Sequence, residues 1–119
     1  MKSLLALLFV ASFSTLYSQD DNWKYYCTDD KGQDMYYDIN TVGIESDYTD
    51  VSIANLYSSK PFFWYVQMYW SSNSILVVSM YNKATGIQYL NTLLDITMLP
   101  NKSPLKKIYN LFKDKGWYK

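Results

Sequence analysis

The stretch Ser74-Ile-Leu-Val-Val-Ser-Met-Tyr-Asn-Lys-Ala-Thr-Gly-Ile-Gln-Tyr-Leu-Asn-Thr-Leu-Leu94 decides the fold, because its pattern predicts a β-hairpin. Two runs rich in β-forming residues, 75–82 and 87–94, flank a polar connection that ends in Gly86. A glycine takes a positive φ without steric cost, as loops of this length often require. A helix is predicted shortly after the hairpin, and we expect that helix to lie on it.

The predicted helix begins at Pro104 and ends before Gly116. Ser103 is a suitable N-cap residue, and proline is tolerated at the first helical position because its missing N–H is harmless there. Glycine is a common residue just beyond a helix end. Apolar residues recur at helical spacing and should dock on the sheet: Leu105, Ile108, Tyr109, Leu111 and Phe112. The opposite face is rich in lysine, which suits either a solvated face or a binding patch.

Alternating apolar and polar residues predict further strands upstream of the hairpin. Trp23, Tyr25 and Cys27 are expected on one face of the first strand. The run around Val66 suits a strand or a short helix, and we favour a strand. The predicted strands are Trp23–Thr28, Met35–Ile39, Tyr48–Tyr57 and Trp64–Trp70. The sequence therefore predicts one α+β domain, a meandering antiparallel sheet of about five to six strands with one C-terminal helix packed on it.

The first residues have the layout of a secretory signal peptide. A short positive segment precedes the apolar run Leu4–Ala11, and small and then strongly polar residues follow it. We predict a signal peptide over 1–18 and a domain over 19–119, exported to the periplasm, the outer surface or the extracellular space. An uncleaved membrane anchor is the alternative, but the run is shorter than the ~20 residues that span a bilayer. No other stretch is apolar enough, so no membrane span is expected after signal removal.

Composition argues against catalysis and against nucleic acid. The chain has no histidine, and its eleven basic residues are all lysines, balanced by eleven acids. Without arginine or a net positive charge, nucleic-acid binding is not expected. Without histidine, His-dependent triads and most zinc sites are excluded. The pairs Asp29 with Asp34 and Asp47 with Asp50 lie in turn-like polar stretches where solvation is the default. We therefore predict no enzyme activity, no cofactor and no metal.

Cys27 is the only cysteine, so it forms no disulfide within the chain. It is expected either as a small buried apolar residue or as the site of an intermolecular disulfide that makes a dimer.

An aromatic cluster is the one feature with potential for binding. The segments Phe62–Tyr65 and Tyr69–Trp70 place six rings within nine residues. If one face of a strand is buried, some of these rings lie on the other face, where they could contact a protein, a sugar or a second subunit. The predicted binding residues are Tyr65, Tyr69 and Trp70. The alternative is that the fold or a subunit partner covers both faces.

Four segments occur in an order shared with a known family. They are Trp23-Lys-Tyr-Tyr26, Gly32-Gln-Asp-Met-Tyr-Tyr-Asp-Ile-Asn40, Tyr81-Asn-Lys-Ala-Thr-Gly86 and Pro100-Asn-Lys-Ser-Pro-Leu105. Through them the chain resembles the surface-adhesin protein E-like family of small exported bacterial domains. The resemblance implies an antiparallel sheet with a packed C-terminal helix, a non-enzymatic role and a tendency to dimerise. Many members link a strand to the last helix by a cysteine pair, and this chain departs from them with Phe112 in that helical region.

The leading functional expectation is an exported, non-catalytic binding domain that recognises a protein ligand, as the family's matrix-binding and plasma-protein-binding founder does. One alternative is an envelope structural or assembly protein that acts by self-association as a homodimer. Another is an inhibitor of a secreted enzyme.

Overall fold

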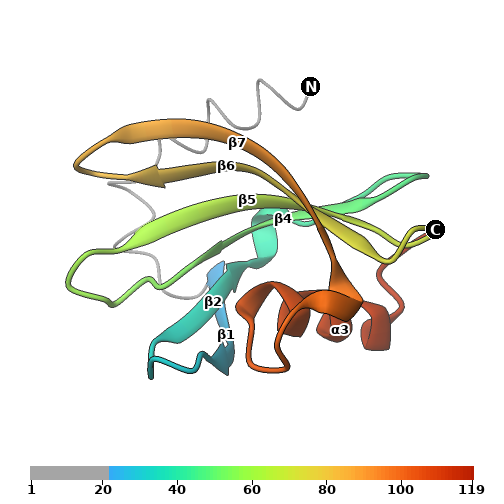
Figure 1. The fold of residues 1–119 in the computed structure, drawn as a ribbon, viewed down its shortest axis with the longest axis horizontal. Helices are drawn as coiled ribbons and strands as arrows, with labels where there is room; N and C mark the ends of the chain where they lie inside the picture. The colour runs from blue at the N-terminus through green and yellow to red at the C-terminus, as the bar shows by residue number, and fades with distance from the viewer. Residues whose placement is uncertain (1–21) are drawn as a thin grey trace.

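The computed structural model describes residues 22–119, so the predicted signal peptide lies outside the described residues. These residues form one antiparallel sheet in the order β1-β2-β4-β5-β6-β7, with the short β3 paired to β4 (Figure 1). One α-helix follows the sheet, as predicted for this fold class. The elements are β1 Trp23–Thr28, β2 Asp34–Asp38, β3 Gly43–Ile44, β4 Thr49–Ala54, β5 Phe62–Tyr69, β6 Ser74–Asn82, β7 Gly86–Asp95 and α3 Pro104–Lys115, with 3-10 turns η2 Ile39–Thr41 and η3 Ile96–Met98.

The hairpin predicted from the sequence is confirmed as β6 and β7. Gly86 has a φ of 72°, the left-handed conformation that its place in the connection requires. The side-chain oxygen of Asn82 accepts hydrogen bonds from the backbone N–H of Thr85 at 2.9 Å and from its hydroxyl at 3.0 Å. An asparagine that bonds its own turn in this way holds the connection in one shape.

The predicted helix is also confirmed, with Ser103 at the N-cap position and a left-handed Gly116 at its C-terminal end. The Ser103 side chain makes no capping hydrogen bond, although its backbone has the extended conformation of a cap. Leu111, which we expected on the apolar face, is only partly buried. The four buried helix residues are Leu105, Ile108, Tyr109 and Phe112.

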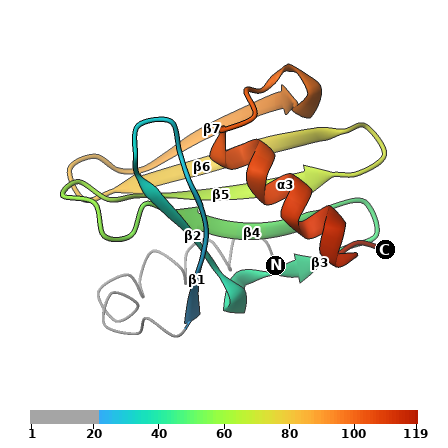
Figure 2. The same cartoon turned by 90° about the horizontal axis from the view of Figure 1, so that it is seen from below.

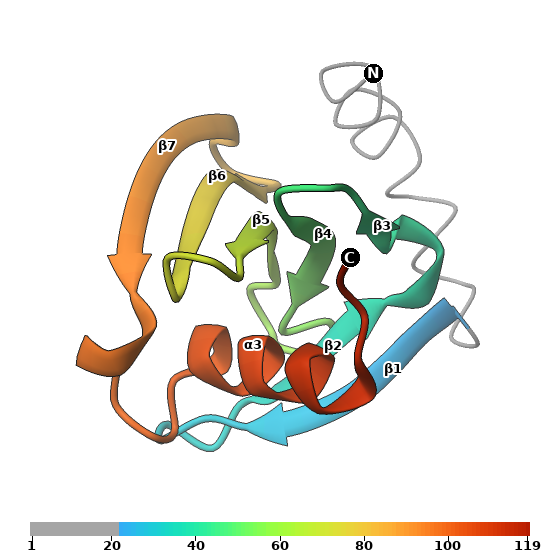
Figure 3. The same cartoon turned by 90° about the vertical axis from the view of Figure 1, so that its right-hand side faces the viewer.

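The expectation that the helix lies on the β6–β7 hairpin is wrong in large part. Figure 2 shows α3 crossing below several strands, and Figure 3 shows the sheet curving around it. The helix lies closest to β1, where the hydroxyl of Tyr26 donates to the carbonyl of Pro104 at 3.0 Å. Of the hairpin, only Ile75 and Val77 belong to the buried core, and most of β7 is exposed. The curved sheet brings β1 and the central strands to the helix and leaves β7, the end strand on the opposite side, outside.

The core lies between α3 and the inner face of the sheet. Phe112 is fully buried and meets Tyr37 edge to face, with their ring centroids 5.4 Å apart. Edge-to-face rings contribute about 1 kcal/mol beyond their buried area. The largest apolar cluster contains Met35, Tyr37, Val51, Ile53, Val66, Met68, Ile75, Val77, Leu105, Ile108, Tyr109 and Phe112.

Trp23, Tyr25 and Cys27 do not share a face, contrary to expectation. The pairing of β1 with β2 shifts register between Tyr25 and Cys27, which marks a β-bulge there. An extra residue in one strand reverses the alternation beyond it. Cys27 therefore joins the core below α3, whereas Trp23 joins a second cluster with Phe63 on the other face. Tyr25 is exposed.

The remaining predicted strands are confirmed with corrected bounds. β5 is a strand and not a helix, and Trp64, Val66 and Met68 face the core as their alternation predicted. β4 ends at Ala54, so Tyr57 lies beyond the strand and is exposed. β3 was not predicted, because a strand of only two residues shows no alternation.

The chain end is fastened to the sheet beside the helix. The hydroxyl of Thr49 donates to the carbonyl of Trp117 at 2.6 Å and accepts from the indole N–H of Trp70 at 3.0 Å. The ring of Trp70 lies against those of Tyr109 and Tyr118, at centroid distances of 4.6 and 5.5 Å. The residues after α3 thus belong to the folded domain.

Candidate binding surface

The outer edge of β7 is the most accessible apolar part of the sheet. Within residues 22–119 no strand pairs with this edge, because β7 ends the strand order. Tyr89 is 68 % exposed and Leu93 is 62 % exposed, and Leu90 is exposed as well. We call these three residues with the backbone of β7 the β7 edge surface.

Tyr89 and Leu93 point to the same side of the sheet, away from α3. Tyr89 lies opposite Ser79 and Leu93 opposite Leu76 on β6, and these in turn lie opposite Tyr65 and Gln67 on β5. Residues directly opposite one another in adjacent strands share a face. Tyr65 and Gln67 alternate with core residues of β5, so the whole row lies on the outer face.

A bulge divides the edge into two parts. Leu90 and Asn91 lie against the single residue Val78 where β7 shifts register against β6, and Asn91 has a φ of 46°. Gly86–Tyr89 precedes the bulge and Thr92–Asp95 follows it. A bulge is one device that limits uncontrolled edge pairing, while charged residues and prolines are others. β7 has no lysine and no proline, and its only charge is Asp95 at the end. The bulge is therefore the main feature of β7 that would limit pairing with another strand, and it would confine such pairing to the segment before it or the segment after it.

Tyr65, Tyr69 and Trp70, the predicted binding residues, do not form one exposed group. Tyr65 is only 6 % exposed, and its hydroxyl donates to Asp50. Tyr69 is half-buried, and its hydroxyl donates to the side-chain oxygen of Gln67 at 2.6 Å. Trp70 is half-buried in the aromatic packing that fastens the chain end. Tyr65 and Tyr69 share the outer face, whereas Trp70 packs on the helix side.

The hydrogen bond between Tyr65 and Asp50 has the features of a contact that stabilises the fold. Both side chains are buried on the outer face. Burial and the hydrogen bond to Asp50 raise the pKa of Tyr65 far above its ordinary value. The phenol therefore keeps its proton at physiological pH and acts as a donor to the carboxylate. It is unsuited to act as a general base.

The carboxylate pairs that we considered from the sequence occupy turns and a buried contact. Asp29 accepts backbone hydrogen bonds from Lys31 at 2.9 Å and Gln33 at 2.8 Å, which shapes the β1–β2 turn. Asp34 accepts from the hydroxyl of Thr28 at 2.7 Å. Asp47 is exposed, whereas its sequence neighbour Asp50 is buried. In the described part of the chain no three acidic or cysteine side chains are grouped to hold a metal ion.

Cys27 is buried beneath α3 as a free thiol. Burial raises the pKa of Cys27 to about 11, against the opposing effect of the nearby Lys107 ammonium. A protonated, buried thiol is a poor nucleophile. This favours the interpretation of Cys27 as a packing residue.

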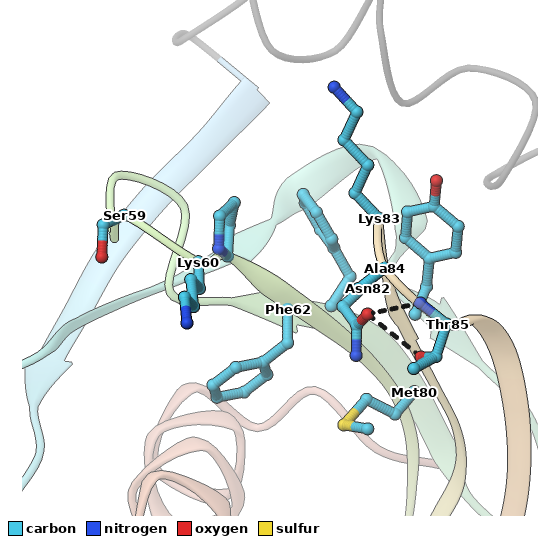
Figure 4. A pocket seen from close by; sticks show the side chains of 11 residues that line it. Ser59, Lys60, Phe62, Met80, Asn82, Lys83, Ala84 and Thr85 are labelled. Atoms are coloured by element: carbon cyan, nitrogen blue, oxygen red, sulfur yellow. Dashed lines mark hydrogen bonds between the residues drawn. The ribbon is translucent and has the colours of Figure 1, made fainter.

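A cleft opens at one end of the sheet, between the β4–β5 connection and the β6–β7 turn (Figure 4). Its volume is about 800 Å³. Phe62 and Met80 contribute apolar walls, and Lys60, Asn82 and Lys83 contribute polar groups. The sequence did not reveal this cleft, because its two sides lie about twenty residues apart and meet only through the pairing of β5 with β6.

Comparison with protein-family models, with curated proteins and with solved structures gives no match for this chain. In residues 22–119 no helix has the length and apolar character needed to cross a membrane.

The β7 edge surface was also missed from the sequence, although one signal was present. Ten successive residues of a strand without an internal charge are visible in the sequence. The sequence does not show that this strand lies at the end of the sheet, because that position depends on the order of all the strands.

Proposed function

We propose that this chain is an exported, non-catalytic domain that binds a protein ligand through the β7 edge surface. The single observation that supports this most strongly is the long uncharged end strand with Tyr89 and Leu93 exposed on it. An extended segment of a partner can add to such an edge by main-chain hydrogen bonds, while side chains beside it give specificity. The resemblance to the protein E-like adhesins supports the same class of function, with a matrix or other host protein as the ligand.

The chemistry of the edge agrees with a role in recognition. A tyrosine and two leucines next to free backbone groups combine apolar contact with a polar end on the ring, a frequent composition at binding surfaces. The bulge at Asn91 leaves short segments of four residues on either side. A partner strand would pair with one of these segments, and the bulge would fix its register.

Binding can be tested with immobilised laminin, fibronectin and collagen, using the chain from residue 19 onward. We expect wild type to bind at least one of them. Leu93→Lys and Tyr89→Lys should each weaken that binding about tenfold, because a charge on the edge opposes strand addition and removes an apolar contact. The control is Asn110→Lys, which adds the same charge on the exposed side of α3.

Failure of wild type to bind any of the three proteins would remove matrix recognition. An equal loss in Asn110→Lys would show that the added charge, and not the edge, is responsible.

Self-association through the same edge is a second candidate function. The edge is apolar and its only charge is Asp95 at the end, so a second copy meets little charge repulsion along it. Sedimentation over a range of concentrations should then show a dimer in wild type and a monomer in Leu93→Lys. Trp70, one of the predicted binding residues that could contact a second subunit, is a poor probe because its substitution would loosen the packing of the chain end.

Export is part of the proposal and rests on the sequence of the first eighteen residues. N-terminal sequencing of the protein recovered from the periplasm or the medium should begin near residue 19. A chain that keeps residue 1 and stays with the cytoplasmic fraction would contradict export.

A further inference from the structure

The cleft at the end of the sheet has walls that suit an apolar chain. Phe62 and Met80 lie on neighbouring strands, and Pro61 continues the apolar lining from the β4–β5 connection. The ring of Phe62 packs on that of Trp64 with centroids 4.8 Å apart, which holds one wall in place. Methionine has a flexible, unbranched side chain that adapts to different ligand shapes. The cleft therefore combines one fixed wall with one adaptable wall.

Besides the hydroxyl groups of Ser59, Tyr81 and Thr85, the polar side chains of the cleft are one amide and two lysines. The side-chain oxygen of Asn82 is already used by Thr85, so only its NH₂ remains to meet a ligand. Figure 4 shows that this nitrogen points toward the space between Phe62 and Met80. Lys60 lies on the Phe62 side of the cleft, and Lys83 extends away from it at the rim (Figure 4). Among residues 22–119, no aspartate or glutamate belongs to the lining.

We propose that this cleft binds a free fatty acid, with the hydrocarbon chain between Phe62 and Met80 and the carboxylate near Asn82 and Lys60. The charge of the lining selects an anion, because Lys60 offers an ammonium group and Asn82 an amide donor, Lys83 adds a second cation at the rim, and no carboxylate among residues 22–119 opposes them. The apolar walls select a ligand with a hydrocarbon chain. A multiply charged phosphate would be favoured by arginine forks or a cradle of backbone N–H groups, and the chain has no arginine.

The volume agrees with this size of ligand. Pockets for small molecules usually measure about 300–1,000 Å³, and the cleft measures about 800 Å³. The proposal does not depend on binding at the β7 edge surface, so the two can fail separately.

The test uses decanoate as the probe and decanol as its uncharged counterpart, with the chain from residue 19 onward. Binding is followed by calorimetry and by amide chemical shifts in an NMR spectrum. We expect decanoate to bind and to shift the amides of Phe62, Met80 and Asn82 more than those of α3. Decanol should bind at least about fivefold more weakly, a loss of the size expected for one partly exposed ion pair.

Lys60→Gln should weaken decanoate binding about fivefold without changing stability, because Lys60 is exposed in a loop. The matched control is Lys113→Gln, which removes the same charge from the exposed face of α3. The double variant Lys60→Gln with Lys83→Gln should weaken binding at least as much as Lys60→Gln alone.

Several results would overturn the proposal. One is the absence of decanoate binding at about 1 mM, a concentration that detects affinities near 4 kcal/mol. Others are equal binding of decanol, an equal loss in Lys113→Gln, or shifts confined to residues outside the cleft. Binding of inorganic phosphate as tight as that of decanoate would indicate a simple anion site. Binding to phosphatidylglycerol vesicles without binding to decanoate would indicate a membrane surface.

Discussion

At the scale of single residues, Asp38 shows how a buried carboxylate is held in this fold. It is buried where β2 ends, and its side chain accepts the backbone N–H of Asn40 at 2.9 Å. Burial raises the pKa of Asp38, and the hydrogen bond from Asn40 opposes that rise only in part. Folding therefore favours the protonated form, and the ionised form carries a cost in the native state.

Asp38→Asn should make the domain more stable at pH 7, because asparagine keeps the hydrogen-bond acceptor and removes the buried charge. The sign follows from the raised pKa. The native state of wild type is favoured below the ordinary carboxyl pKa of about 3.9, and that advantage is lost as the pH rises through the higher native value. The stability difference between variant and wild type should thus grow from pH 3 to pH 7 in urea unfolding. Asp47→Asn, at an exposed position, is the control, and a difference independent of pH would contradict the prediction.

Cys27 should react slowly in the native protein. With its pKa raised to about 11 by burial, the thiol is almost fully protonated at pH 8. We expect a thiol-specific disulfide reagent to modify it at least about 100-fold more slowly in buffer than in urea, because two pKa units change the thiolate fraction by that factor. Non-reducing gels should accordingly show a monomer. Equal rates in buffer and in urea would show that the thiol is accessible. The interpretation of Cys27 as the site of an intermolecular disulfide would then be favoured again.

At the scale of elements, bulges decide which side chains reach the core. The bulge in β1 moves Cys27 to the helix side, and the bulge in β7 leaves Leu90 and Asn91 without regular partners. The alternation of apolar residues predicted the core face of β5 correctly, since Val66 and Met68 lie on a regular part of that strand. The alternation failed to predict the faces of β1, because a single extra residue in a strand cannot be recognised from the types of residue in it.

The hydroxyl of Thr49 on β4 should be important for stability, because it links Trp70, directly after β5, to Trp117 near the chain end. Thr49→Val keeps the shape of the side chain but leaves the indole N–H of Trp70 and the carbonyl of Trp117 without their shared partner. We expect a loss of about 1–3 kcal/mol in the free energy of unfolding, the usual cost of leaving buried polar groups unpaired. Urea unfolding followed by tryptophan fluorescence measures it. Thr92→Val on exposed β7 should change stability by less than about 0.5 kcal/mol, and a similarly small effect at Thr49 would contradict the prediction.

At the scale of the whole molecule, the sequence was sufficient for the longer elements and insufficient for the two-residue β3 and for the arrangement of the strands. Helix spacing and the capping residues at Ser103 and Gly116 are local signals, and they predicted α3 correctly. The burial of Tyr65 depends on Asp50, fifteen positions away, and so on the register of β4 against β5. The exposure of β7 depends on the order of all the strands. For the same reason the predicted binding residues lie on β5 and directly after it, whereas the most accessible apolar side chains of the sheet lie on β7.

The position of α3 has a consequence for biosynthesis. Its four buried side chains come from residues 105–112, so the sheet lacks the cover of its inner face until this segment has left the ribosome. A nascent chain without that cover exposes Val51, Ile53 and Val66 to water and gains little from closing the sheet. Such a polypeptide would stay unfolded throughout most of its synthesis. A secretion channel that transports unfolded chains requires this state of its substrates.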